Sequence, residues 1–276
     1  MASPNQRADA LRGHLLVKPG STVHLADVDP NATFGYHKAS ADRKVARDLQ
    51  RLTELQERIW AERRHRVLIV LQGIDAAGKD GTIKHVMSAF NPLGCRVTGF
   101  GVPTPTELAH DYLWRVHPNV PGSGEISIFN RSHYEDVLVV RVHELVPRET
   151  WSRRYEQINA FEKLLVDEGT TILKFFLYID RAEQLARFRA RYEDSTKRWK
   201  FRVEDLEERK RWDDYIAAFQ DAVSRCSTER APWYVVPANH KWFRNLAVGE
   251  IVADTLEALK PAYPPRDDIP KNLTFS

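Results

Sequence analysis

Several features that mark particular classes of protein are scarce in this chain of 276 residues. Its two cysteines, Cys95 and Cys226, are too few for a disulfide framework and lack the spacing of a zinc site. No stretch approaches the roughly 18 consecutive apolar residues of a membrane-spanning helix, and residues 1–16 lack the apolar core of a signal peptide. We therefore expect a cytoplasmic protein with no membrane partner and two free, buried thiols.

A strong excess of charge is also missing, because 41 Lys and Arg residues stand against 38 Asp and Glu residues, a net charge of +3. The position of the basic residues is therefore more informative than their number. No internal repeat or low-complexity tract interrupts the sequence, and 42% of the residues are apolar, as is ordinary for a globular protein. A chain of this length can bury a substantial core, as one α/β domain with insertions or as two small domains.

Apolar runs alternate with segments of helical periodicity along the chain. This pattern predicts strands at residues 66–72, 95–101, 125–130, 171–179 and 233–236. It predicts helices at residues 40–64, 79–90, 104–117, 132–140, 149–168, 180–193, 203–226 and 241–259. Strands separated by helices are typical of a parallel sheet that is covered on both faces. Residues 1–39 are predicted to form an arm over the domain surface, and residues 261–276 an extended tail.

The first predicted strand runs into a glycine-rich turn, Gly-Ile-Asp-Ala-Ala-Gly-Lys-Asp-Gly-Thr at residues 73–82. The turn matches the P-loop pattern G-x-x-x-x-G-K-S/T, except that Asp80 replaces the final Ser or Thr. In a P-loop, backbone N–H groups and the N-terminus of the next helix bind phosphate, and the lysine adds a positive charge. An ordinary strand–turn–helix with tightly packed glycines would share part of this pattern. The predicted phosphate-binding residues are Gly73, Ala76, Ala77, Gly78, Lys79, Asp80, Gly81 and Thr82.

Acidic residues near this turn indicate a divalent cation. Asp75 lies inside the turn, and a carboxylate beside a phosphate is repulsive unless a cation lies between them. The third predicted strand ends at Asn130, and Glu135 and Asp136 follow closely. Ligands of open α/β sheets bind at the carboxyl ends of strands, so one of these acids is expected to join Asp75 at a Mg²⁺ site. Both acids also suit the first turn of a helix.

A basic segment at residues 187–211 has ten basic residues against six acidic ones. Two predicted helices flank its central turn, an arrangement typical of a mobile lid that closes over a P-loop and excludes water. Cations on such a lid would neutralise charge on phosphoryl oxygens. We therefore predict a helical lid at residues 181–226. Its phosphate-binding cations are expected at Lys197, Arg198 and Lys200, whereas Arg187 and Arg211 are expected on a solvated face.

Several blocks of this sequence together resemble the family-2 polyphosphate kinases, over roughly residues 15–265. The blocks are the turn at residues 73–82, Phe-Gly-Val-Pro-Thr at 100–104, Phe-Asn-Arg-Ser-His-Tyr-Glu-Asp-Val-Leu at 129–138, Lys-Arg-Trp-Lys-Phe at 197–201 and Ala-Pro-Trp-Tyr-Val-Val-Pro-Ala at 231–238. The resemblance implies a single domain over residues 1–276. It also implies a three-layer α/β/α sandwich of the P-loop NTPase type, similar to thymidylate kinase, with a central parallel sheet and a helical lid.

The same resemblance implies a function and roles for the matching positions. The expected reaction is Mg²⁺-dependent, reversible phosphoryl transfer between inorganic polyphosphate and nucleotides, ADP to ATP and AMP to ADP. The expected catalytic residues are Asp75, Lys79 and Arg131, with metal ligands at Asp75, Glu135 and Asp136 and nucleotide contacts at Asn130, Tyr134 and Glu135. Some members of the family have Asp where Asn130 stands, and residues 129–136 look most like the branch that phosphorylates both nucleoside mono- and diphosphates. We also expect a homo-oligomer.

Two other functions share parts of this pattern. An ATP-dependent nucleotide kinase of the same fold would use ATP in place of the polymer. A nucleic-acid-binding protein with an inactive P-loop could stack the tryptophan at 199 on a base. The chain has no extended basic tail and no known nucleic-acid-binding motif, so we do not expect a nucleic-acid partner.

Overall fold

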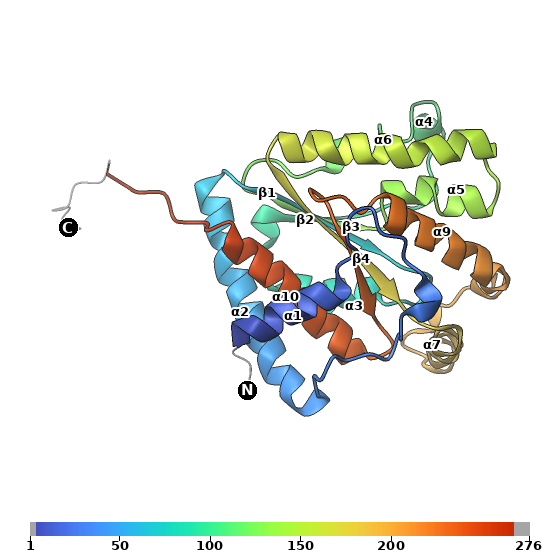
Figure 1. Cartoon of the computed structure of the whole chain (residues 1–276), viewed down its shortest axis with the longest axis horizontal. Coiled ribbons are helices and arrows are strands. Elements are labelled where there is room, and N and C mark those ends of the chain that lie inside the picture. The colour runs from blue at the N-terminus through green and yellow to red at the C-terminus, as the bar shows by residue number, and fades with distance from the viewer. Residues whose placement is uncertain (1–3, 268–276) are drawn as a thin grey trace.

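The computed structural model describes residues 4–267 and has a central sheet between two layers of helices (Figure 1). The strands are β1 (Arg66–Gln72), β2 (Cys95–Gly99), β3 (Ile126–Asn130), β4 (Thr170–Tyr178) and β5 (Trp233–Pro237). They are all parallel, in the order β2-β3-β1-β4-β5. Central β1 is buried from Val67 to Gln72 because helices cover both of its faces. The predicted three-layer α/β/α architecture is confirmed.

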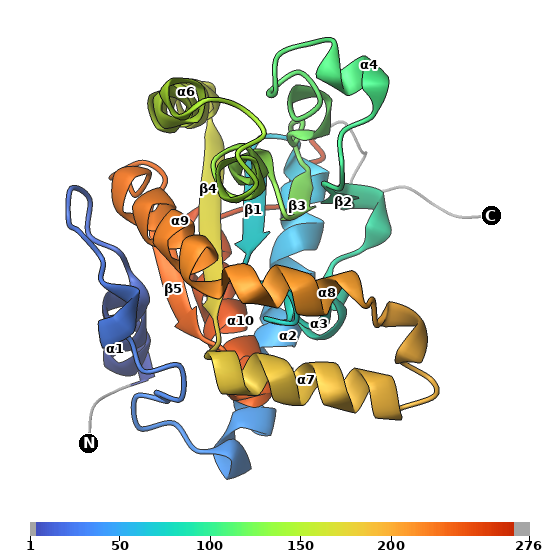
Figure 2. The same cartoon turned by 90° about the vertical axis from the view of Figure 1, so that its right-hand side faces the viewer.

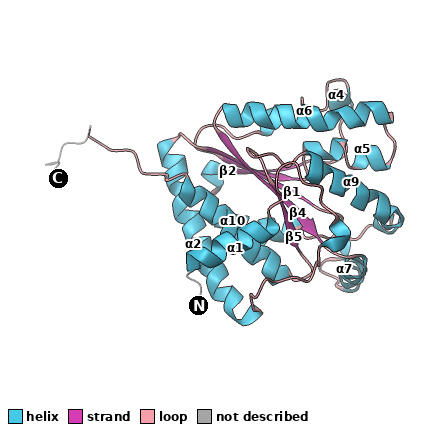
Figure 3. Ribbon diagram, viewed as in Figure 1, coloured by secondary structure: helices cyan, strands magenta, loops and turns pink. Residues whose placement is uncertain are grey.

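Two groups of helices cover the sheet (Figures 2 and 3). One face carries α2 (Lys38–Glu62), α3 (Lys79–His85) and α10 (Lys241–Ala258), and the other carries α5 (Val139–Val142), α6 (Arg148–Asp167) and α9 (Trp212–Arg225). Helix α7 (Arg181–Glu193) lies beyond the carboxyl ends of the strands and is followed by the short α8 (Glu204–Glu208). Helix α10 is buried along most of its length, whereas α2 buries one stripe that includes Leu52, Leu55 and Ile59. None of the helices in the described part of the chain is long and apolar enough to cross a membrane.

Some predicted helices are shorter in the structure. The helix predicted at residues 104–117 is only α4 (Pro105–Leu108), closed at its start by a capping box between Thr104 and Glu107. A turn follows this helix, in which the side chain of Asp111 accepts a hydrogen bond from the backbone of Leu113 at 3.0 Å. The helix predicted from residue 132 is a 3₁₀ turn followed by α5, and the one predicted at 203–226 is divided into α8, a 3₁₀ turn and α9.

The first 39 residues contain a helix that their composition did not indicate, α1 (Pro4–Leu15). Its Leu11 and Leu15 are 1% and 2% exposed and join the main core, so tertiary docking rather than a long amphipathic pattern stabilises this helix. The next residues run along the edge of the sheet, where the backbone N–H of Val17 donates to the carbonyl of Trp233 at 2.9 Å. Parts of the predicted arm (residues 1–3) and tail (residues 268–276) lie outside the described residues.

Candidate active site

A cavity of about 1500 Å³ opens at the carboxyl ends of the strands. Its lining includes Asp80, Phe100, Arg131, Arg187 and Lys241, which lie in the segments that follow β1, β2, β3, β4 and β5 respectively. Strand β1 pairs with β3 on one side and with β4 on the other. The turn after β1 therefore lies between the segments that follow β3 and β4. Open α/β sheets bind their ligands at this edge.

The turn at residues 73–82 adopts a conformation that requires its glycines. A Cβ atom on Gly73 would lie 2.8 Å from the carbonyl oxygen of Leu177, and Gly78 has a φ of +112°. Of the predicted phosphate-binding residues here, Ala76, Gly78, Lys79, Asp80 and Gly81 line the cavity. The others support the turn from behind: Thr82 is fully buried, and both its N–H and its hydroxyl donate to the carbonyl of Gly78. Gly73, Ala77 and Thr82 lie outside the cavity lining, and contact of these three with phosphate stays a prediction.

The three predicted catalytic residues meet at this turn. Lys79 is 8% exposed, and its ammonium donates to the carbonyl of Gly73 at 2.6 Å, while burial and the nearby Arg131 lower its pKa. Arg131 donates from Nη2 to Asp75 Oδ1 at 3.0 Å and has a φ of +63°, a strained conformation of the kind that occurs at functional sites. Gln184 of α7 holds the backbone carbonyl of Asp75 at 3.1 Å. The site thus places two cations and one carboxylate around the P-loop.

The predicted metal-binding acids separate into two environments. Glu135 accepts a hydrogen bond from Gln72 at 3.1 Å and interacts electrostatically with Asp75, and burial raises its pKa. Asp136 instead accepts from Arg154 Nη1 at 2.9 Å outside the cavity lining, and burial raises its pKa to about 6. Asp136 is thus paired with Arg154 away from the cavity, and its role as a metal ligand stays a prediction. The described residues contain no group of three or more His, Cys, Asp or Glu placed to hold a metal by themselves.

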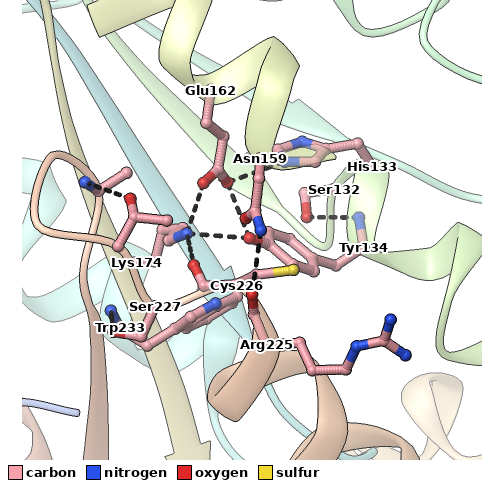
Figure 4. Close-up of polar contacts among 12 residues, drawn as sticks. Ser132, His133, Tyr134, Asn159, Glu162, Lys174, Arg225, Cys226, Ser227 and Trp233 are labelled. Atoms are coloured by element: carbon pink, nitrogen blue, oxygen red, sulfur yellow. Dashed lines mark hydrogen bonds and ion pairs between the residues drawn. The ribbon is translucent and has the colours of Figure 1, made fainter. Parts of the chain in front are cut away.

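Tyr134, a predicted nucleotide contact, lies instead in a buried polar network (Figure 4). It is fully buried, and its hydroxyl donates to Glu162 at 2.9 Å and accepts from the ammonium of Lys174 at 2.9 Å. Lys174 also donates to Glu162 at 2.5 Å and to the carbonyl of Cys226 at 2.7 Å. The prediction for Tyr134 is corrected, since its side chain points into the core and has no access to the cavity.

The lid cations differ in their orientation. Lys197 and Lys200 line the cavity, and Lys200 lies 3.5 Å from Asp80, which also accepts from Asn130 at 2.9 Å. Burial alone would raise the pKa of Asp80, but the hydrogen bond from Asn130 and the charge of Lys200 lower it. Arg198 turns away from the cavity, because its Nε donates to the carbonyl of Tyr192 at 2.7 Å and its guanidinium stacks on that ring. The phosphate-binding role of Arg198 stays a prediction.

The predicted lid region at 181–226 includes α9, which belongs to a helix layer on the sheet. Helix α9 packs on the sheet, where Phe219 stacks on Phe176 with 4.4 Å between ring centroids. Within the predicted lid region, α9 is thus part of the helix layer on the sheet, and only α7, α8 and the turn between them lie over the cavity side. In the described structure this turn holds Trp199 77% exposed at the cavity margin.

Two arginines at the cavity were not identified as site residues from the sequence. Arg187, predicted on a solvated face, is 7% exposed and donates from Nη1 to the carbonyls of Ala76 and Ala77, both at 2.9 Å. Gln184, also buried, lies three residues before Arg187 and four before Phe188, a helical spacing that could have indicated a buried face. Arg244 is 2% exposed and lies beside the P-loop. The only sequence feature that could have indicated it is a basic residue next to mostly apolar ones in α10.

A P-loop at the end of a parallel strand, with a basic lid beside it, defines a phosphotransferase of the P-loop kinase type. The sequence model described as polyphosphate kinase 2 matches residues 35–264. The chain therefore belongs to the polyphosphate kinase 2 family.

Proteins of known activity and structure show the same relationship. The chain is 53% identical over 250 residues to an AMP/ADP-polyphosphate phosphotransferase from Meiothermus ruber. This match covers 90% of this chain and 94% of the relative. It is 46% identical over 249 residues to an ADP-polyphosphate phosphotransferase from Rhodopseudomonas palustris, over 86% of this chain and 85% of the relative. A crystal structure of polyphosphate kinase 2 from Arthrobacter aurescens is 43% identical and superimposes with a TM-score of 0.89, over 93% of this chain and 92% of that one.

Proposed function

We propose that this protein transfers phosphoryl groups reversibly between inorganic polyphosphate and nucleotides, forming ATP from ADP and ADP from AMP. The observation that supports this most is the meeting of Asp75, Lys79 and Arg131 at a P-loop whose cavity is also lined by eight further Lys and Arg residues against two further Asp residues. A phosphate polymer is charged at every unit and has no base to recognise, so a site rich in cations suits it. The printed activities of the two relatives, on AMP and ADP and on ADP, agree with these acceptors.

The residues of the chain perform positioning and charge neutralisation, which phosphoryl transfer mainly requires. The P-loop and Lys79 bind the phosphate at the end of β1. Arg131, from the neighbouring strand, leaves its ion pair with Asp75 and neutralises charge on the transferring group. Lys197 and Lys200 approach from the lid, and closure of the lid excludes water from the transfer. On the β3 side Asn130 borders the space that we assign to the nucleotide.

We propose Mg²⁺ as the cofactor, held by Asp75 and Glu135 together with phosphate oxygens. The two carboxylates fit this ion because Mg²⁺ binds through one or two carboxylates, substrate phosphates and water rather than through a complete protein cage. Asp75 lines the cavity, and Glu135, although outside that lining, interacts electrostatically with both Asp75 and Lys79, which supports this assignment. When bound, the ion would offset negative charge on the phosphates that these residues orient.

The direct test is an assay of ATP formation by the purified protein with ADP, Mg²⁺ and polyphosphate, followed by luciferase luminescence. We expect ATP with the wild-type protein and a loss of at least about 100-fold in Lys79→Met, given what a single phosphate-directed cation contributes to a transition state. The same assay with AMP tests the second acceptor. Transfer from ATP to AMP without any use of polyphosphate would instead identify an ATP-dependent nucleotide kinase.

A further inference from the structure

Gln72 is a buried polar residue at the end of the central strand. It is the last residue of β1, and the five residues before it, from Val67 to Leu71, are all apolar and buried. Gln72 itself is 1% exposed. A buried amide costs free energy unless it is hydrogen-bonded, and a β-branched apolar residue would suit this strand better. A glutamine here therefore has a specific purpose.

The amide of Gln72 binds two side chains of one turn. Its Nε2 donates to Ser132 Oγ and to Glu135 Oε1, both at 3.1 Å, which uses both of its N–H groups. Ser132 caps the 3₁₀ turn, because its hydroxyl oxygen also accepts from the backbone N–H of Tyr134 at 3.1 Å. Glu135 lies in the same turn, between the buried Tyr134 and Asp136, and is only partly buried itself. Gln72 thus connects the strand that leads into the P-loop with a carboxylate of the neighbouring turn.

The backbone of this turn is held in place by other contacts. At its start, the backbone N–H of Arg131 donates to the carbonyl of Leu71 at 3.1 Å. Farther along, the hydroxyl of Tyr134 donates to Glu162 at 2.9 Å in the buried network of Figure 4. Neither contact involves the side chain of Gln72, so the turn keeps its position without that amide. The amide instead fixes the orientation of one carboxylate.

Glu135 has one oxygen bound by the protein and one that is available. Oε1 accepts from Gln72, whereas Oε2 has no hydrogen-bond or ion-pair partner within residues 4–267. The carboxylate interacts electrostatically with Arg131, Lys79 and Asp75, so it lies near the P-loop. Carboxylates that bind metal ions are commonly held in this way, with a hydrogen bond from a neighbouring side chain that orients the ligand.

We propose that Gln72 is a positioning residue, which holds Oε1 of Glu135 and so leaves Oε2 directed to the Mg²⁺ ion that we assign to Glu135 and Asp75. This assignment rests on the proposed function and adds a residue that contacts neither substrate nor metal. An apolar side chain in its place would fill the space but leave the carboxylate free to rotate. The positive charges of Lys79 and Arg131 would then draw Glu135 into an ion pair and away from the ion.

The test compares Gln72→Met with the wild-type protein at increasing Mg²⁺, with polyphosphate and ADP saturating. Methionine keeps the length of the side chain and removes the N–H donors. We expect the Mg²⁺ concentration that gives half-maximal activity, the Mg²⁺ midpoint, to rise about tenfold or more, as is usual when a metal ligand loses its orienting hydrogen bond. At saturating Mg²⁺, kcat should return to within about threefold of the wild-type value, and the KM for polyphosphate should change less than about twofold.

Binding is measured without turnover from melting temperatures. The rise that ADP produces with Mg²⁺, minus the rise that it produces with a chelator, reports the contribution of the ion. At a Mg²⁺ concentration near the wild-type midpoint, this difference should fall to less than half in Gln72→Met. A purely structural role for the glutamine would lower the melting temperature of the unliganded protein and leave this difference unchanged.

Gln56→Met is the matched control. Gln56 of α2 is also 1% exposed, and its Oε1 accepts from the backbone N–H of Asn91 at 3.1 Å, outside the cavity lining. The control variant should lower the melting temperature without changing the Mg²⁺ midpoint. If Gln72→Met does not fold, Gln72→Asn keeps an amide in the strand. Its side chain is one methylene too short to reach Glu135, so its Mg²⁺ midpoint should rise in the same way.

A double variant tests whether Gln72 acts through Glu135. Glu135→Gln removes the carboxylate and should itself raise the Mg²⁺ midpoint. Adding Gln72→Met to it should then change the midpoint by less than about twofold, because no carboxylate remains to be oriented. Effects of the two single variants that multiply in the double variant would overturn the proposal, since Gln72 would then act on another group.

The remaining contrary results are also distinct. An unchanged Mg²⁺ midpoint in both Gln72→Met and Gln72→Asn would overturn the positioning role and leave the proposed function intact. Full activity of the wild-type protein without a divalent cation would remove Mg²⁺ from the proposed function, and the positioning role with it. Failure of the wild-type protein to form ATP from polyphosphate would overturn the proposed function itself.

Discussion

Replacing Lys174 by methionine should destabilise the fold by about 3–5 kcal/mol at pH 8, the cost of leaving one member of a buried ion pair uncompensated. The lysine is fully buried in β4 and donates three hydrogen bonds, to Glu162, Tyr134 and the carbonyl of Cys226. The variant keeps the length of the side chain but leaves the carboxylate of Glu162 in the core with hydrogen bonds from His133 and Tyr134 only.

The dependence of this cost on pH follows from Glu162. In the wild-type protein burial would raise its pKa, but the charge of Lys174 and the hydrogen bond from His133 lower it overall. The lowered pKa stabilises the fold above the ordinary range of the carboxyl group, and this contribution is lost as the pH falls through the folded value. Without Lys174, burial dominates and the carboxyl binds a proton more tightly when folded. The loss in the free energy of unfolding caused by Lys174→Met should therefore become smaller as the pH falls from 8 to 5.

Urea unfolding followed by tryptophan fluorescence measures these differences in the free energy of unfolding. The double variant Lys174→Met/Glu162→Leu should be more stable than the sum of the two single costs implies, with a coupling of about 2–3 kcal/mol. A cost of Lys174→Met below about 1 kcal/mol, or one that is independent of pH, would refute the view that this network is a compensated ion pair.

Three other predictions follow from the site and the thiols. Gly78→Ala should abolish turnover and lower the melting temperature, because its Cβ would overlap Arg244, whereas Gly99→Ala has open space around its Cβ and should do neither. The double variant Lys197→Gln/Lys200→Gln should raise the KM for polyphosphate several-fold, by a factor that shrinks as salt is added; Arg198→Gln, whose side chain faces away, is the matched control. Burial raises the pKa of Cys95 to about 11 and that of Cys226 to about 12, so neither thiol should react quickly with a disulfide reagent at pH 8 until urea unfolds the protein.

Local pattern predicted those elements whose residues interact with near neighbours in the chain. The strand at 66–72 has the predicted boundaries, since an apolar run bounded by Gly73 is itself the signal for a buried strand. The P-loop turn and the start of α3 follow from the same segment. Helix α1 was missed because packing against α10 and β5, which lie far along the chain, stabilises it.

Side-chain roles were harder to predict than elements. The sequence after Asn130 places Tyr134 and Glu135 side by side, but the 3₁₀ turn sends one into the core and the other toward the P-loop. Arg187 and Arg244 reach the site from helices far along the chain, so only the packing of those helices reveals them. In each case the missing information is a tertiary contact, which local spacing does not encode.

The anchoring of Arg187 restricts how the mouth of the site can open. This residue, halfway along α7, bonds to the carbonyls of Ala76 and Ala77 and, through Nη2, to those of Ala238 and Asn239. The first half of α7 is thereby tied to the loops that follow two strands and is part of the frame. We therefore predict that opening for a long substrate moves the outer half of α7 and the turn that follows it, rather than the whole helix.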